Sequence, residues 1–170
     1  MDTVLTRDDY LGSGDSGSGF HVCIEVPDLD LAIDFYGRVL GLPIAWRQTF
    51  SGEFLDRLTE MTDVSVEVAQ LACPGGSRIE LAQFDPQGQR DNRRIIDAGL
   101  HHISFGFRDP HSVYERLIAA GVPFASPVQQ QIVPGAVVDR WWVAYFYDPW
   151  GHRLELFSPD PETGDNPKLF

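Results

Sequence analysis

The sequence has little cysteine, little positive charge and no long apolar run. Its two cysteines, Cys23 and Cys73, form no CxxC motif, so we expect reduced thiols rather than a disulfide framework. Lys and Arg number 13 against 25 Asp and Glu, a formal net charge of −12 without a basic cluster. This balance argues against nucleic-acid binding and against attraction to an anionic membrane. The longest apolar stretch, 141–147, has the length of a strand, far below the roughly 20 residues that span a bilayer.

The ends and the middle of the sequence indicate its organisation. The start lacks the apolar core and cleavage pattern of a signal peptide, so we expect a cytoplasmic protein. Hydrophobic residues make up 43% and charged residues 22%, which is typical of a globular chain. The expected parts are a flexible leader at 1–19, a single domain at 20–158 with modules at about 20–84 and 100–158, a linker at 85–99, and an irregular tail at 159–170.

An internal repeat underlies the two modules. Segments 21–28 and 102–109 align, and each reads as a strand that opens with His and ends with Asp. That Asp can cap a following helix, whose apolar spacing stops at Gly41 in the first half and at Gly121 in the second. Strand-like segments split by turn residues close each half, at 64–72 and 78–84 and at 141–147 and 152–157. Each half therefore predicts the order β-α-β-β-β, with an extra short helix at 53–60 in the first half alone.

The repeat gives four polar residues a meaning that none has alone. Each Glu could simply face solvent on a half-exposed strand, because its apolar neighbours point the other way. The two halves nevertheless place His and Glu at equivalent positions, and a pseudo-twofold arrangement would bring two imidazoles and two carboxylates together. Such a set suits Fe(II), Co, Ni, Zn or Mn better than it suits calcium. The four residues are His21, Glu80, His102 and Glu155.

The sequence resembles the vicinal oxygen chelate superfamily, which includes glyoxalase I, methylmalonyl-CoA epimerase, extradiol dioxygenases and bleomycin-resistance proteins. The segments that carry the resemblance are 21–29, 35–42, 78–81, 99–105 and 148–156. The resemblance implies an α+β fold in which two tandem βαβββ modules form a curved, partly open mixed sheet around a metal cavity. It also implies one divalent transition metal (Ni, Co, Zn, Mn or Fe), with the family's ligands at His21, Glu80, His102 and Glu155.

Three further histidines need a role. Because neighbouring strand residues face opposite sides, His101 and His102 are not expected to point inward together. The alignment with His21 selects His102, so we expect His101 at the surface or behind the ligand. We expect His111 and His152 to be structural or solvent-exposed.

The resemblance implies a lyase or isomerase of the glyoxalase and epimerase type. Its substrate is a small molecule with vicinal oxygens, and a proton is abstracted next to a carbonyl through a metal-stabilised enediolate. Glu155 is the first candidate for the base and Glu80 the second. Glu25 stands where bacterial glyoxalase I would have an Arg for the glutathione carboxylate, which weighs against glutathione. Glu25 is either a further acid/base group or a rim residue paired with Arg78.

Two alternatives stay open. One is a non-haem Fe(II) dioxygenase with His21, His102 and Glu155 as a facial triad. The other is a metal-free, ligand-sequestering protein of the resistance type. We expect a homodimer, since small open sheets leave edges to cover, and the modules could pair within one chain or exchange across two.

Overall fold

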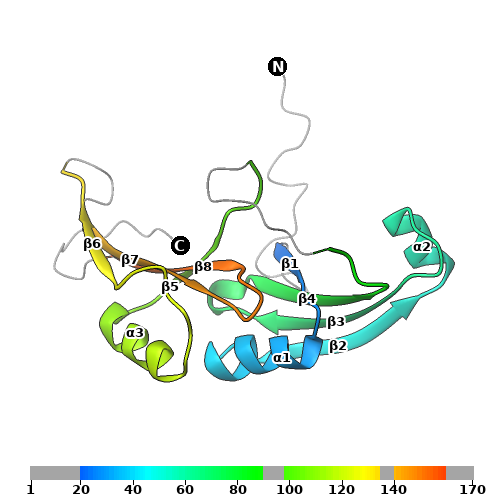
Figure 1. The fold of residues 1–170 in the computed structure, drawn as a ribbon, viewed down its shortest axis with the longest axis horizontal. Helices are drawn as coiled ribbons and strands as arrows, with labels where there is room; N and C mark the ends of the chain where they lie inside the picture. Colours follow the sequence, from blue (N-terminus) through cyan, green and yellow to red (C-terminus); the bar gives the residue numbers. More distant parts are fainter. Residues whose placement is uncertain (1–19, 90–97, 135–139, 160–170) are drawn as a thin grey trace, which may run out of the picture. The chain divides into compact units, whose positions relative to one another are not determined.

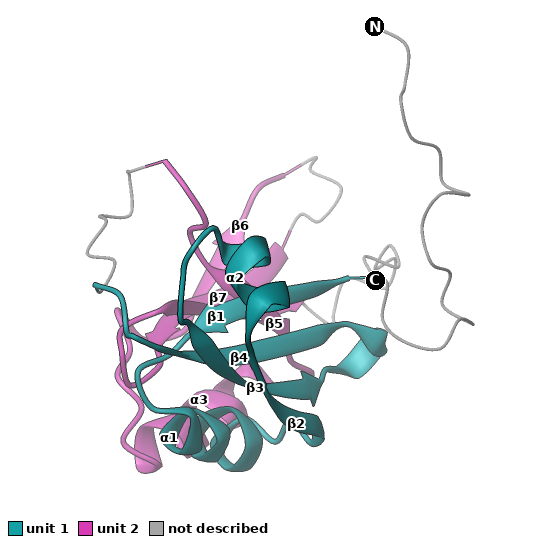
Figure 2. Cartoon of the chain, turned by 90° about the vertical axis from the view of Figure 1, so that its right-hand side faces the viewer, with its two compact units in different colours: residues 1–90 teal, residues 91–170 magenta. Residues whose placement is uncertain are grey.

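The computed structural model describes residues 20–89, 98–134 and 140–159. The chain divides into two compact units, Met1–Arg90 and Asp91–Phe170, which Figure 2 draws in different colours. This division falls inside the segment 85–99 that the sequence marks as a connection. The expected leader and almost all of the expected tail lie outside the described residues. In the part of the chain that is described, no helix has both the length and the apolar character needed to cross a membrane.

Unit 1 is a four-stranded mixed sheet with helices (Figure 1). Its elements are β1 (His21–Glu25), α1 (Leu29–Ile33), the π-helical turn η2 (Asp34–Val39), β2 (Ile44–Ser51), α2 (Glu53–Thr59), β3 (Ser65–Ala72), the short turn η3 (Pro74–Gly76) and β4 (Arg78–Asp85). The strand order is β1-β4-β3-β2, with β1 parallel to β4 and the other pairs antiparallel. The extra helix expected at 53–60 is confirmed as α2.

Unit 2 repeats the same topology. Its elements are β5 (Ile103–Gly106), α3 (Pro110–Ala119), β6 (Gln129–Ile132), β7 (Arg140–Tyr147) and β8 (Arg153–Pro159). The order is β5-β8-β7-β6, and the first and last strands are again the parallel pair. The expected α+β class and tandem βαβββ order are confirmed, and the strands form two open four-stranded sheets.

The residues that the sequence predicts to begin and end the helices have these roles in the structure. The Asp28 carboxylate accepts a hydrogen bond from the backbone N–H three residues on, at 2.9 Å, and Asp109 does the same at 2.9 Å. Both oxygens thereby satisfy a donor that the first turn of a helix leaves without a partner. Gly41 and Gly121 follow the helical segments with φ of 76° and 80°, the left-handed region that favours glycine.

The two faces of the unit 1 sheet have different surroundings. Ile79 and Leu81 are buried on the face that α1 covers. Gln83 shares this face, and its side-chain oxygen accepts a hydrogen bond from the backbone N–H of Leu29 at 2.7 Å. Because side chains alternate along β4, Glu80 points to the opposite face.

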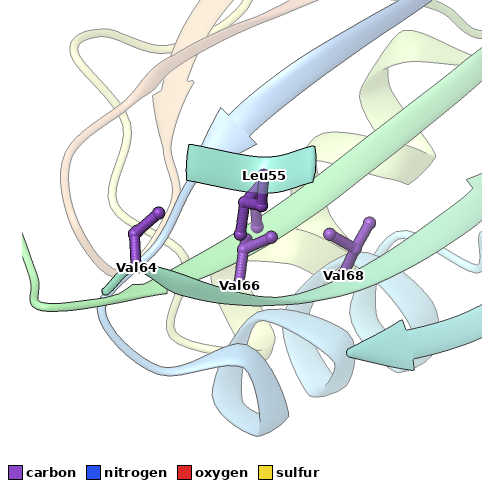
Figure 3. Close-up of a cluster of buried hydrophobic side chains, with 5 residues drawn as sticks. Leu55, Val64, Val66 and Val68 are labelled. Atoms are coloured by element: carbon purple, nitrogen blue, oxygen red, sulfur yellow. The ribbon is translucent and has the colours of Figure 1, made fainter. Parts of the chain in front are cut away.

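An apolar cluster occupies one end of the Glu80 face (Figure 3). Leu55 of α2 is 4% exposed and packs against side chains of β3 and β4. The buried members are Leu55, Val64, Val66, Val68 and Ala82, with Phe50 and Phe84 packed beside them. Ala82 is the next residue after Glu80 on the same face of β4, so the cluster extends to the neighbour of Glu80.

In unit 2, α3 covers one face of the sheet. The ring of His111 in α3 lies 4.5 Å from the ring of Trp142, centroid to centroid. Leu154 and Leu156 of β8 are fully buried. Glu155 lies between them in sequence, so its side chain points to the opposite face.

Candidate functional site

His102 and Glu155 lie side by side in unit 2. His102 Nε2 is 3.6 Å from Glu155 Oε2, and the two side chains are 31% and 16% exposed. This separation is too long for a hydrogen bond. It is shorter than twice the ~2.1 Å that joins a divalent metal to an imidazole nitrogen or a carboxylate oxygen. The donor types and their spacing therefore fit one transition metal ion bound by both side chains.

The two units place their Glu residues by the same strand register. In each unit the Glu is the Cα partner, across the parallel strand pair, of the residue two positions after the His. Ser104 stands opposite Glu155 in unit 2, and Cys23 stands opposite Glu80 in unit 1. The sequence repeat is thus a structural repeat at the level of individual strand partners.

Of the two predicted His and Glu pairs, the structure shows the pair in unit 2, His102 and Glu155, in close proximity. His21 in unit 1 is exposed, and by alternation on β1 it shares a face with Cys23 and therefore with Glu80. Across residues 20–89, 98–134 and 140–159, no group of three or more His, Cys, Asp or Glu side chains gathers as a metal site. The full set of four ligands remains a prediction.

Cys23 is a neighbour of the site that sequence reasoning missed. It is the strand partner of Glu80 across the parallel β1–β4 pair. Desolvation is the first cause that raises the pKa of Cys23 to about 12, followed by the charge and hydrogen bond of Glu80 and the charge of Glu25. At neutral pH the side chain is therefore a thiol and not a nucleophilic thiolate.

His101 does not lie where strand alternation predicts. Its Nδ1 is 2.9 Å from His102 Nδ1, and both rings contact Tyr145, with centroids 6.2 and 5.4 Å away. The expectation that the two histidines face opposite sides is wrong because β5 begins at Ile103, after both of them. Strand alternation therefore does not determine the direction of either side chain.

Arg153 also contacts this group of His101, His102 and Tyr145. Its Nη1 lies 3.4 Å from His101 Nε2. Its guanidinium carbon lies 5.8 Å from the ring centre of Tyr145 and 5.9 Å from that of Tyr147. A guanidinium over aromatic rings gains cation–π attraction, so the arginine is held against the histidine pair.

Glu25, the third candidate acid/base residue, is exposed at the end of β1. Its Oε1 lies close to the backbone of Gly88, where an added Cβ would be 3.5 Å away. Within the described residues no ion pair joins Glu25 to Arg78, so the expected rim pair is not seen. Its acid/base role remains a prediction.

Trp46 and Gln70 form a further feature of the Glu80 face that the sequence did not indicate. Gln70 is the strand partner of both Glu80 and Trp46. The Trp46 indole N–H donates to the Gln70 side-chain oxygen at 3.0 Å, and Phe50 packs edge-on at 6.5 Å. With 37% of its surface exposed, Trp46 offers an aromatic face to a small molecule.

The remaining histidines have structural surroundings. His152 Nδ1 is 2.7 Å from the Asp148 carboxylate, which also accepts the backbone N–H groups of His152 at 2.8 Å and Trp150 at 3.0 Å. Asp148 is 2% exposed, so these bonds satisfy a buried charge in the β7–β8 turn. His111 is exposed at the start of α3. Neither histidine lies beside Glu155.

The tandem βαβββ units, with a His and a Glu at matched positions, define the class of this chain as a paired-module α+β protein. The model of the Glyoxalase/Bleomycin resistance protein/Dioxygenase superfamily matches residues 20–156. The chain belongs to this superfamily.

Relatives with assigned activities include two enzymes. The chain is 30% identical over 142 residues to 2-epi-5-epi-valiolone epimerase of an Actinomyces species, an alignment that covers 81% of this chain and 77% of the relative. It is 28% identical over 153 residues to lactoylglutathione lyase of Pseudomonas aeruginosa, covering 80% and 79%. These similarities indicate an enzyme of the superfamily.

Solved structures agree with the fold. A glyoxalase family protein from Bacillus cereus has a TM-score of 0.69 and 26% identity, covering 87% of this chain and 97% of that one. A glyoxalase/bleomycin resistance protein/dioxygenase domain from a Frankia species has a TM-score of 0.60 and 27% identity, covering 88% and 94%.

Proposed function

We propose that the chain is a metal-dependent epimerase or isomerase that moves a proton at the carbon next to a carbonyl. The observation that carries the proposal is the His102 and Glu155 pair, 3.6 Å apart, in which Glu155 occupies the same strand-register position as Glu80 in unit 1. The similarity to an epimerase and a lyase supports the same class of reaction.

In this proposal His21, Glu80, His102 and Glu155 hold one divalent transition metal ion. A bound ion of this kind supplies Lewis-acid polarisation of the substrate carbonyl, which makes the neighbouring C–H more acidic. Two imidazoles and two carboxylates give the nitrogen and oxygen ligands that such ions accept. The two pairs come from equivalent halves of the repeat, within one chain or across a homodimer.

Glu155 is the proposed base. It is mostly shielded from solvent and lies beside His102, so a proton taken there stays within the site. Glu80 is the second candidate, and Cys23 stands opposite it across the parallel β1–β4 pair. A positioned base of this kind contributes roughly 10²–10⁴-fold to the rate.

The epimerase reading is preferred to the glutathione-dependent lyase. Glu25 carries a negative charge at the end of β1, on the face of Cys23 and Glu80. A substrate that carries carboxylates, as glutathione does, meets repulsion there. We expect a substrate without carboxylates, of the kind represented by the valiolone that the first relative epimerises.

Metal content and proton exchange test the proposal together. Purified wild-type protein and the His102→Ala variant are loaded with divalent metals near neutral pH and measured by elemental analysis. About one transition metal ion per chain in the wild type, lost in the variant, is expected. Loaded protein is then incubated in deuterium oxide with 2-epi-5-epi-valiolone and, separately, with a glutathione hemithioacetal. Deuterium incorporation next to the carbonyl of the valiolone, detected by NMR, is the expected result.

The alternatives give different results in the same experiment. Iron with oxygen uptake and no deuterium exchange would identify the dioxygenase reading. No metal after add-back would identify a ligand-sequestering protein and overturn the proposal. The Glu155→Gln variant is expected to lose exchange more severely than Glu80→Gln, and the reverse order would move the base to Glu80.

A further inference from the structure

The contact between His101 and His102 joins two ring nitrogens that are usually directed to other groups. The two Nδ1 atoms are 2.9 Å apart, and both residues precede β5. A nitrogen pair at this distance shares one hydrogen, since two N–H groups would clash and two lone pairs would repel. The tautomer of one neutral ring therefore dictates the tautomer of the other.

Arg153 sets the direction of this hydrogen bond without metal. A guanidinium can only donate, so His101 Nε2, at 3.4 Å from Arg153 Nη1, accepts. The proton of neutral His101 is then on Nδ1 and is donated to His102 Nδ1. Neutral His102 in turn carries its proton on Nε2, the atom that lies 3.6 Å from Glu155 Oε2. Arg153, His101 and His102 thus form one directed series of donors.

A metal ion on His102 Nε2 requires the opposite arrangement. Binding there needs an unprotonated Nε2, so the proton of the neutral ring must sit on Nδ1. Ligand histidines commonly donate this second N–H to an outer acceptor, which fixes the ring and makes the ligand more basic. At 2.9 Å, His101 Nδ1 stands where that acceptor is needed.

We propose that His101 is the positioning residue of His102, and that metal loading reverses the tautomers of both rings. The inference rests on the proposed function, because it assumes that His102 is a ligand. The protons balance: His102 changes from Nε2–H to Nδ1–H, His101 changes from Nδ1–H to Nε2–H, and the pair holds two protons throughout. Arg153 then faces an N–H instead of an acceptor and loses its hydrogen bond to His101.

If His101 acted on His102 only by ring packing, substitutions of His101 would have different effects from those expected for a hydrogen-bond acceptor. Both imidazoles pack on Tyr145, and a phenyl ring at position 101 would keep much of that contact while removing the acceptor. The side-chain oxygen of asparagine reaches about the same place as Nδ1 of histidine and can accept the hydrogen bond. His101→Phe and His101→Asn therefore separate packing from hydrogen bonding. His111→Phe is the matched control, an exposed histidine of the same unit that contacts Trp142.

The test measures Zn²⁺ affinity by competition with a chromophoric chelator, with circular dichroism to check the fold. We expect His101→Phe to weaken binding by about 10–100-fold, His101→Asn to restore most of it, and His111→Phe to leave it unchanged. Histidine ring nitrogen NMR of wild-type protein should show His102 change from Nε2–H to Nδ1–H on Zn²⁺ addition, with His101 changing in the opposite sense.

The failures are distinguishable. If wild-type protein binds none of the divalent transition metals offered to it, Zn²⁺ included, the proposed function is overturned and the inference falls with it. If wild-type protein binds Zn²⁺ and His101→Phe binds it within about twofold, the inference alone is overturned. The inference is also overturned if His101→Asn binds as weakly as His101→Phe, or if the His101 tautomer is the same before and after loading.

Discussion

Cys23 and Glu80 are partners across the parallel β1–β4 pair, and the Glu80 carboxylate helps to raise the pKa of the Cys23 thiol. This places a weak donor against a predicted metal ligand in unit 1. The equivalent position in unit 2 is Ser104, opposite Glu155. Each Glu therefore has a small side chain with a donor group as its strand partner, so the repeat extends to the neighbours of the predicted ligands.

The raised pKa of Cys23 predicts slow alkylation. At about pH 8, a pKa of about 12 leaves a thiolate fraction on the order of 10⁻⁴, and the thiolate is the reactive form. In metal-free Cys73→Ser protein, the rate of iodoacetamide labelling should rise about tenfold per pH unit between about pH 8 and pH 10. Mass spectrometry of the labelled peptide measures it. Labelling at pH 8 as fast as that of free cysteine would contradict the structure.

The helix caps predict matched losses of stability in the two units. Asp28→Ala and Asp109→Ala each remove an acceptor at 2.9 Å from a first-turn N–H, and each should lower the free energy of unfolding by about 1 kcal/mol. Urea denaturation followed by circular dichroism measures the loss. The Asn variants keep an acceptor at the same place and should stay close to wild type. Equal losses for Ala and Asn would rule out capping as the cause.

Helix α2 allows a core variant and its control on one element. Leu55→Ala opens a cavity among Val64, Val66 and Val68 and should cost about 2–5 kcal/mol of unfolding free energy. Leu58 on the same helix is 68% exposed, so Leu58→Ala should stay within about 0.5 kcal/mol of wild type. Chemical denaturation of both variants checks the difference. Similar losses would mean that α2 is not held by its Leu55 side.

Mixing two inactive variants tests how the proposed ligand pairs combine. His21→Ala is altered in unit 1 and Glu155→Gln in unit 2. If the modules exchange across a homodimer, a refolded one-to-one mixture contains hybrid dimers with one intact ligand set, and it should regain about a quarter of wild-type metal content. If they pair within one chain, the mixture should bind as little metal as either variant alone. Co-refolding followed by elemental analysis distinguishes the two.

Much of the fold could be predicted from the sequence because its signals are local. The His-to-Asp strands, the capping aspartates and the glycine stops each depend on a few neighbouring residues. Strands β2 and β6 were not located beforehand. Seven of the eight residues of β2 and all four of β6 (QQQI) are exposed positions on edge strands. Strand β6 has no apolar alternation, and in β2 the apolar positions Ile44, Trp46 and Phe50 are interrupted by Gln48. Edge strands of this kind are defined by the strand they pair with and not by their own pattern.

The candidate site could be predicted in its residue types but not in its contacts. The repeat selected His102 and Glu155, and the structure puts them 3.6 Å apart. The Cys23 contact with Glu80 depends on strand register, which a pattern with period two does not provide across sixty residues. His101 lies behind His102, one of the two positions expected for it, but the two rings are on the same side because alternation does not apply before β5 begins.

The parallel pairing of first and last strands in each unit has a consequence for folding. His102 and Glu155 sit in the opening and closing segments of their unit, so their contact has a large sequence separation and a high cost in loop-closure entropy. Local structure such as α3 and the β7–β8 hairpin can form earlier, since its contacts are short-range. The ligand pair therefore arises late, once β8 has docked beside β5. A metal ion that binds this pair would stabilise the unit after it has folded and would not direct the folding of the chain.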